Sequence, residues 1–159
     1  MIMSTADVLT AIQNSAVAHA ISKSDHLVGA ALQVVHVMGF ILLLASLVLM
    51  SLRLLGLVLK HQAVADVVAD ASRLLWIGLA LAVVSGTLMF VSSPKLYFYK
   101  FAFELKMLLF VVAVLVQFTV FRKVARTEAP RPAFVRATVA FSLVTWFGIG
   151  LAGRMIGFT

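Results

Sequence analysis

The sequence contains no cysteine among its 159 residues. Disulfide bridges, thiolate metal sites, iron–sulfur clusters and haem attached covalently through thioethers are therefore excluded. Charged residues are scarce, at 12%, and only six residues are acidic. No pair of carboxylates, no nucleophile–base arrangement and no glycine-rich phosphate loop is evident, so we do not expect a hydrolytic enzyme.

Apolar residues are abundant instead. Hydrophobic residues make up 63% of the chain and the mean hydropathy is +1.11. Soluble domains are roughly 45–50% apolar, so this excess is larger than a soluble core could bury. Residues 29–59 form an apolar run that exceeds the about 20 residues needed to cross a bilayer. The sequence therefore indicates an integral membrane protein.

The apolar runs predict an all-α protein with four transmembrane helices at about 27–52, 72–92, 101–121 and 134–157. Residues 60–73 are expected to form the first loop. Short loops force an up-down-up-down bundle with antiparallel neighbours, formed by residues 26–159. Residues 1–25 carry apolar side chains at helical spacing but are too polar to span, which predicts one amphipathic helix on the membrane surface.

The positive charges predict the orientation of the bundle. Because basic residues concentrate in cytoplasmic loops, the first and third loops are expected inside and both termini outside, in the periplasm for a bacterial inner membrane. The net charge of +7 is therefore a topology signal, and no nucleic-acid partner is expected. The inner set is Arg53, Lys60, Arg73, Arg122, Lys123, Arg126, Arg131 and Arg136, and the outer set is Lys23, Lys95, Lys100, Lys106 and Arg154.

Polar residues inside the spans collect in the outer half of the predicted bundle. His36 lies about ten residues into the first span, or about 15 Å of helix rise. A buried polar group needs a partner or a ligand. We therefore predict a polar pocket that opens outward, with His36 as its floor. Its expected members are His36, Gln33, Gly39, Glu104, Lys106 and Arg154.

His36 has two interpretations. Its imidazole could form a hydrogen bond to Gln33, to a backbone carbonyl or to a hydroxyl of a neighbouring helix. It could instead bind haem iron or another metal, since imidazole is the commonest metal ligand. Gly39, one turn away, would leave room for a flat porphyrin. The sixth ligand of the iron would then be a methionine, water or His36 of a second copy; the methionines considered are Met38, Met89, Met107 and Met155.

The other polar residues also allow two interpretations. Arg154 is either an interfacial anchor or a clamp for an anion such as a haem propionate. Glu104 and Lys106 are either interfacial charges or a pair with Arg154, and Glu104 could relay protons. A weak copper site could combine His19 and His26 with the methionines at the start, Met1 and Met3.

Four segments resemble a known family: residues 35–56, 74–90, 101–114 and 142–158. Their order and spacing are similar to an uncharacterised family of small bacterial four-helix membrane proteins, itself similar to the membrane domain of CopD-type copper-resistance proteins. The resemblance implies kinship with copper-handling and b-type cytochrome bundles. Ser51 and Gln33 stand where the family pattern has an acid. The matching residues are His36, Gly39, Arg53, Leu54, Leu55, Gly56, Lys106, Trp146, Gly153 and Arg154.

Together these patterns favour a membrane redox protein that holds a b-type haem in the outer half through His36, with Arg154 on a propionate. If it is an enzyme, we expect an oxidoreductase or electron-transfer component. One alternative is an accessory subunit that packs on other membrane subunits, or on a second copy, through small residues such as the Gly78–Ala82–Gly86 ladder and the Gly153–Gly157 step. The other is a copper-handling protein that uses His36 and methionines. Membrane lipid is a partner in every case.

Overall fold

The computed structural model describes residues 4–24, 26–127 and 130–158, and these contain helices but no strand. The long helices are α3 (His26–Leu54), α4 (Val64–Ser92) and α8 (Pro132–Met155), together with α6 (Phe101–Val116), which continues through the π-turn η1 (Gln117–Phe121) into α7 (Arg122–Arg126). Each of the four resulting rods is long and apolar enough to cross a membrane. The predicted all-α, four-helix architecture is therefore confirmed.

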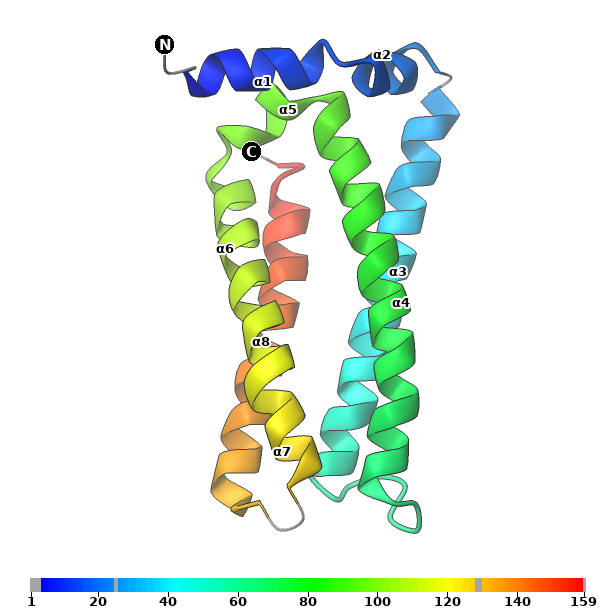
Figure 1. Ribbon diagram of the computed structural model, residues 1–159, viewed down its shortest axis with the longest axis vertical. Helices are drawn as coiled ribbons and strands as arrows, with labels where there is room; N and C mark the ends of the chain where they lie inside the picture. The colour runs from blue at the N-terminus through cyan, green and yellow to red at the C-terminus, as the bar shows by residue number, and fades with distance from the viewer. Residues whose placement is uncertain (1–3, 25, 128–129, 159) are drawn as a thin grey trace.

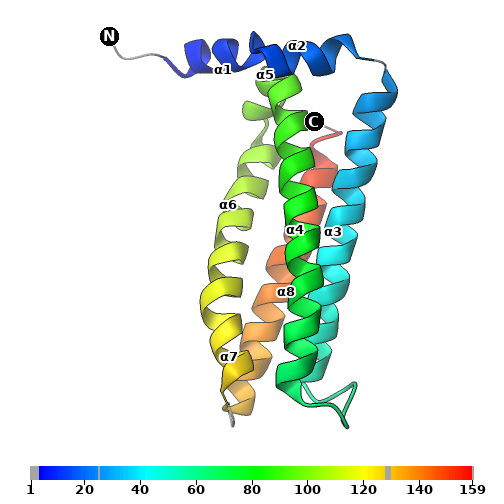
Figure 2. The same ribbon diagram turned by 45° about the vertical axis from the view of Figure 1, so that its right-hand side comes forward.

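The rods form two antiparallel hairpins (Figures 1 and 2). In the first, α3 packs mainly on α4; in the second, α6, η1 and α7 pack on α8. The short helix α5 (Pro94–Phe98) connects the hairpins, and both termini lie at its end of the bundle (Figure 1). We call this the surface-helix end, and the opposite end, with residues 55–63, the loop end.

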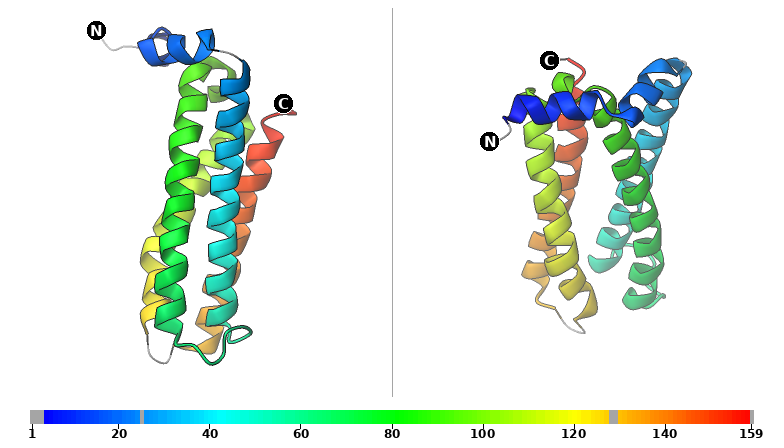
Figure 3. Two further views of the ribbon diagram at one scale, coloured as in Figure 1. Left: turned by 90° about the vertical axis from the view of Figure 1, so that its right-hand side faces the viewer. Right: turned by 45° about the horizontal axis from the view of Figure 1, so that its top comes forward.

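The predicted single surface helix is in fact two, α1 (Thr5–Gln13) and α2 (Ala16–Lys23), which lie across the surface-helix end (Figure 3). The division has a local cause, because each helix has its own serine cap. Ser4 and Asp7 form a capping box at α1, and Ser15 accepts a hydrogen bond from the Ala18 amide at α2. The buried Leu9 and Ala18 hold the pair on the bundle, with α1 against α5 and α2 against α4.

The first loop is shorter than the predicted 60–73, because α4 begins at Val64. Asp70 and Arg73 lie on an exposed helical turn, 3.6 Å apart, so their charges mark a helix that continues beyond the apolar stretch. At the other side of the loop, Gly56 has a φ of +70° and the Leu57 amide bonds the Leu52 carbonyl. This left-handed turn ends α3, and glycine adopts it without strain.

The first hairpin is closed by two glycines. A Cβ on Gly39 would lie 2.9 Å from the Gly78 carbonyl oxygen, and one on Gly78 would lie 2.6 Å from the Gly39 oxygen. Both distances are shorter than any carbon–oxygen contact that a methyl group could make, so only glycine allows these backbones to approach. Gly78 and Ala82 of the small-residue ladder are thus buried within the chain, against α3.

The apolar core lies toward the loop end and draws on all four rods. Its largest fully buried side chains are Trp146, Phe121, Leu43, Leu47 and Met50. Large aliphatic side chains such as Val144 and Leu151, 72% and 69% exposed, point away from the core. This arrangement, with apolar residues inside and outside, is expected of a bundle that is surrounded by lipid.

Candidate functional site

The imidazole of His36 is held by α4. Its Nδ1 lies 2.8 Å from the carbonyl oxygen of Ala82 and 3.2 Å from Oγ of Ser85. A carbonyl only accepts, and the Ser85 hydroxyl already donates to the Leu81 carbonyl at 2.6 Å. Both partners of Nδ1 are therefore acceptors, which places the proton on Nδ1 and the lone pair on Nε2.

The lone pair of Nε2 faces the second hairpin. The ammonium nitrogen of Lys106, on α6, lies 3.4 Å from it, and the amine is the donor in this contact. A Cβ on Gly153 of α8 would lie 3.4 Å from the same Lys106 nitrogen. Lys106 therefore extends from α6 along α8 to reach α3, and His36 and Lys106 connect the two hairpins.

Glycines make room for the side chains between the hairpins. A Cβ on Gly86 would lie 2.9 Å from Cε1 of His36, and one on Gly150 would lie 2.9 Å from the Phe40 ring. His36 and Phe40 are one turn apart on the same face of α3. Gly86 of α4 therefore contacts the first of these two rings, and Gly150 of α8 contacts the second. The Gly153 position belongs to this interior set, whereas the exposed Gly157 lies beyond the last residue of α8.

The predicted pocket is only partly assembled. His36 and Lys106 meet, and Gly39 is buried one turn from His36 at the hairpin contact. Gln33 and Glu104 are exposed, and neither contributes a hydrogen bond to His36. Of the two alternatives for Arg154, Glu104 and Lys106, the described residues show no ion pair between Arg154 and Glu104. The exposed Arg154 guanidinium lies over the Phe158 ring, 4.8 Å from its centre.

A backbone carbonyl and a hydroxyl of a neighbouring helix, two of the partner types that the sequence predicted for His36, are the ones found, but sequence reasoning did not identify them as Ala82 and Ser85. Ala82 and Ser85 lie three residues apart on one face of α4. Ala82 is part of the small-residue ladder, so the ladder was the sequence feature that could have indicated which face of α4 meets His36.

Lys106 was predicted as a member of the pocket, either as an interfacial charge or as a pair with Arg154, but its contact with His36 was not predicted. The sequence feature that could have indicated its inward direction is Gly153, whose missing side chain leaves space for a neighbouring residue. Gly153 was considered instead as part of a step that packs on another subunit or a second copy.

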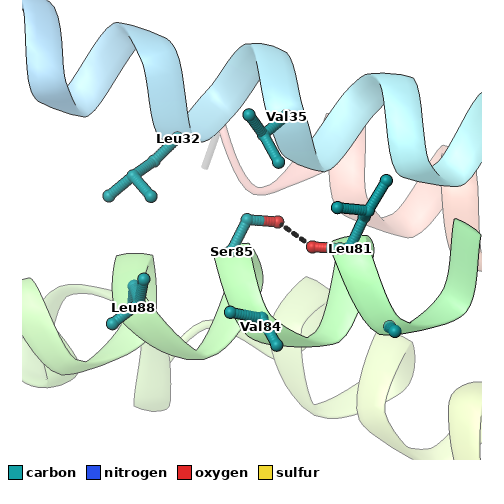
Figure 4. A pocket seen from close by; sticks show the side chains of 7 residues that line it. Leu32, Val35, Leu81, Val84, Ser85 and Leu88 are labelled. Atoms are coloured by element: carbon teal, nitrogen blue, oxygen red, sulfur yellow. Dashed lines mark hydrogen bonds between the residues drawn. The ribbon is translucent and has the colours of Figure 1, made fainter. Parts of the chain in front are cut away.

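A separate apolar groove of about 230 Å³ lies on the outer side of α3 and α4 (Figure 4). Ser85 is its one polar residue, and Figure 4 shows its hydroxyl bonded to the Leu81 carbonyl. The groove thus offers apolar contact and no unpaired polar side chain. Its lining residues are Leu32, Val35, Ala80, Leu81, Val84, Ser85 and Leu88.

Within the described residues, no group of three or more His, Asp or Glu side chains lies close enough to hold a metal ion. Met1 and Met3 of the predicted copper site lie outside these residues. The metal-binding donor offered by the site is therefore Nε2 of His36, with the Lys106 amine directly opposite.

The chain belongs to a family of unknown function, DUF6644, whose profile matches residues 13–159. The resemblance to an uncharacterised family is thus confirmed. No curated protein and no solved structure matches the chain.

Proposed function

We propose that this protein is a membrane redox protein that holds a b-type haem through Nε2 of His36, between the two hairpins near the surface-helix end. The observation that carries the proposal is the 2.8 Å bond from Nδ1 to the Ala82 carbonyl. Histidines that bind metals almost always donate their other N–H to a carbonyl or carboxylate, which fixes the ring and directs the lone pair.

His36 would supply one nitrogen ligand through Nε2, and in this structure the space beside that nitrogen is filled by Lys106. Phe40 and the glycine-lined faces of α4 and α8 provide an apolar environment. A bound haem would supply one-electron chemistry, while the chain holds the imidazole and excludes water. Lys106 now faces Nε2, so haem binding requires its flexible side chain to withdraw from that nitrogen. Arg154, in the last turn of α8 at the same end, is the proposed partner of a propionate.

The proposal includes an orientation in the bacterial inner membrane with both termini in the periplasm. It is supported by the basic residues at the loop end, among them Arg122, Lys123 and Arg126. A reporter enzyme fused after Thr159 tests it: activity in the periplasm supports this orientation, and activity only in the cytoplasm reverses it. Kinship with CopD-type membrane domains remains part of the proposal and is compatible with a haem bundle.

The direct test is the visible spectrum of the protein purified in detergent, with and without dithionite. We expect a Soret band that is lost in His36→Ala and retained in His61→Ala, a matched change at an exposed loop histidine. A colourless wild-type protein that does not take up added haem would contradict the proposal, as would an undiminished band in His36→Ala.

The second candidate is a non-catalytic accessory subunit that packs on other membrane subunits or on a second copy. One observation favours it, because both ring nitrogens of His36 have partners within the chain, as in a structural hydrogen bond between helices. A colourless protein that co-purifies with membrane subunits, and loses them on substitution of exposed Val144 or Leu151, would support this candidate. Copper handling is tested in the same preparation by calorimetric titration.

A further inference from the structure

We infer that the second hairpin carries a binding site for an anionic phospholipid at the loop end, between the end of α7 and the start of α8. A pocket of about 410 Å³ lies at this corner, and Figure 1 shows that α7 and the first turns of α8 lie at the loop end. Small-molecule sites have volumes of about 300–1,000 Å³. The pocket is separate from His36, so the inference goes beyond the proposed function and does not depend on haem. Its lining residues are Lys123, Val124, Thr127, Pro130, Arg131 and Phe134.

Lys123 and Arg131 give the pocket two positive charges from different helical segments. Both side chains are exposed, and within the described residues neither forms a hydrogen bond or an ion pair. The Thr127 hydroxyl already donates to the Lys123 carbonyl at 2.9 Å, so the ammonium and the guanidinium are the donors left for a ligand. Both groups bind phosphate oxygens, the ammonium as a point charge and the guanidinium through its planar fork. The ligand that fits them is a phosphate group.

The cations of the surface-helix end are different, because several have partners inside the chain. Lys100 donates to a backbone carbonyl at 2.8 Å, Lys106 donates to an imidazole, and Arg154 lies over an aromatic ring. In the part of the chain that the structure describes, Lys123 and Arg131 have no comparable partner. Their charges are therefore available to a molecule outside the chain.

The apolar part of the lining favours a lipid over a free phosphate. Val124 is buried, whereas the Phe134 side chain is 50% exposed in the first turn of α8. Inorganic phosphate gains nothing from an exposed phenylalanine ring, but the glycerol and first methylenes of a phospholipid would bury apolar surface against it. The loop end is also the proposed cytoplasmic end, and basic pockets between membrane helices on that side bind acidic head groups.

The test is native mass spectrometry of the protein purified in detergent, stripped of lipid and titrated with dioleoylphosphatidylglycerol. Dioleoylphosphatidylcholine, whose head group is zwitterionic, is the reference lipid. We expect tighter binding of the anionic lipid, weakened about fivefold by Lys123→Gln or Arg131→Gln and about 25-fold by both, from the typical contribution of a basic residue at a membrane surface. Lys123→Arg should retain binding, because the positive charge is kept.

Lys60→Gln and Arg73→Gln are the matched controls, since they remove exposed charges of the first hairpin toward the same end. They should leave the affinity for phosphatidylglycerol unchanged. Equal losses in these controls, or equal affinity for the two lipids, would mean that the basic surface attracts lipid without a specific site, and would overturn the inference. Circular dichroism of each variant excludes unfolding as the cause of a loss.

Phe134→Ala separates a lipid from a free phosphate. We expect it to weaken phosphatidylglycerol binding severalfold, because the acyl end of the head group loses its apolar contact. Inorganic phosphate should displace the lipid no better than chloride at equal ionic strength. An undiminished affinity in Phe134→Ala, or displacement by inorganic phosphate alone, would identify a phosphate site and overturn the lipid as its occupant.

Discussion

The two hairpins of this bundle are held together by different means. In the first, the backbones of α3 and α4 touch at Gly39 and Gly78, so no side chain separates them. In the second, α6 and α8 are separated by large rings and amides: Phe110 packs edge-on against Trp146 with centroids 6.3 Å apart. Backbone contact allows little adjustment, whereas packed side chains change rotamer, so we infer a rigid and an adaptable hairpin.

The polar contacts follow the same division. His36 is bound to the backbone of the rigid hairpin through the Ala82 carbonyl. Lys106 reaches it from the adaptable one. The adaptable hairpin also contains the π-turn η1, and such turns are often found near functional sites. In this turn the Gln117 amide oxygen accepts a hydrogen bond from the Ser142 hydroxyl at 3.3 Å. An imidazole that is fixed to the rigid hairpin is therefore contacted by a long, movable side chain from the adaptable one.

The largest effect is expected from Gly78→Ala. Its added methyl would lie 2.6 Å from the Gly39 oxygen and 2.7 Å from the Leu43 amide nitrogen, and neither backbone atom has room to move. We expect a loss of about 3 kcal/mol in the free energy of unfolding, the upper part of the range for overpacking. Thermal or denaturant unfolding in detergent, followed by circular dichroism, measures it.

Gly148→Ala makes the same change in the other hairpin. Its methyl meets only the tip of the Leu109 side chain, at 3.3 Å, which has other rotamers available. We expect a change within about 0.5 kcal/mol. Equal losses at Gly78 and Gly148 would contradict the distinction between a rigid and an adaptable hairpin.

Gly86→Ala should have the next largest effect. The methyl would lie 2.9 Å from Cε1 of His36 and push the ring off the Ala82 carbonyl. An imidazole moves more easily than a backbone, so we expect a loss of about 1–2 kcal/mol. The same unfolding assay applies, with Gly29→Ala as control, where an added Cβ meets nothing within 4 Å. Equal stability of the two variants would mean that the His36 ring is not packed against Gly86 of α4.

The sequence predicted the rods and their faces well, because both follow from apolar runs and small-residue spacing. The predicted start of α4 is too late, because the charged residues Asp70 and Arg73 are typical of a loop. A helix can extend beyond the apolar stretch into water without a large loss of free energy. The partners of His36 were not predictable in the same way. They depend on which turn of α4 faces the ring, and that register is fixed by the contact between Gly39 and Gly78.

Lys106 illustrates a second limit of sequence reasoning. Its position near the start of a span predicted either an interfacial charge, because lysines there usually extend toward water, or a pair with Arg154 in the pocket. The direction of so long a side chain depends on the space left by other helices, here at Gly153. Arg154, for which an interfacial anchor and an anion clamp were both predicted, lies on the exposed face of α8 beside Phe158.

Ser142→Ala tests the adaptable hairpin. Removal of the hydroxyl leaves the buried Gln117 oxygen without its donor. Because a hydrogen bond between membrane helices contributes only about 0.6 kcal/mol on average, we expect a loss of about that size in the free energy of unfolding. In Ser46→Ala the lost bond is to the Leu42 carbonyl within α3, so no acceptor on another helix is left unpaired and a smaller loss is expected. If Ser142→Ala instead lowered the free energy of unfolding by several kcal/mol, the second hairpin would be as rigid as the first.

The smallest effect concerns α1, which lies against the α5 link between the hairpins. Hydrogen bonds from the Ser4 hydroxyl and then the Ser4 amide lower the pKa of Asp7 below its usual range. The folded cap therefore binds fewer protons than the unfolded segment, and its stabilisation is complete above the usual pKa of about 3.9 and lost as the pH falls through the lowered value.

Amide hydrogen exchange in residues 5–13 measures this change between neutral pH and pH 3, after correction for the intrinsic exchange rate. Protection of α1 is expected to fall in acid, while the α3–α4 contact at Gly39 and Gly78 keeps its protection, because that contact is made by backbone atoms and involves no titrating group. Asp7→Asn should remove the pH dependence, since its amide does not titrate. If α3 and α4 loosened together with α1, the first hairpin would depend on the surface helices rather than on its own glycines.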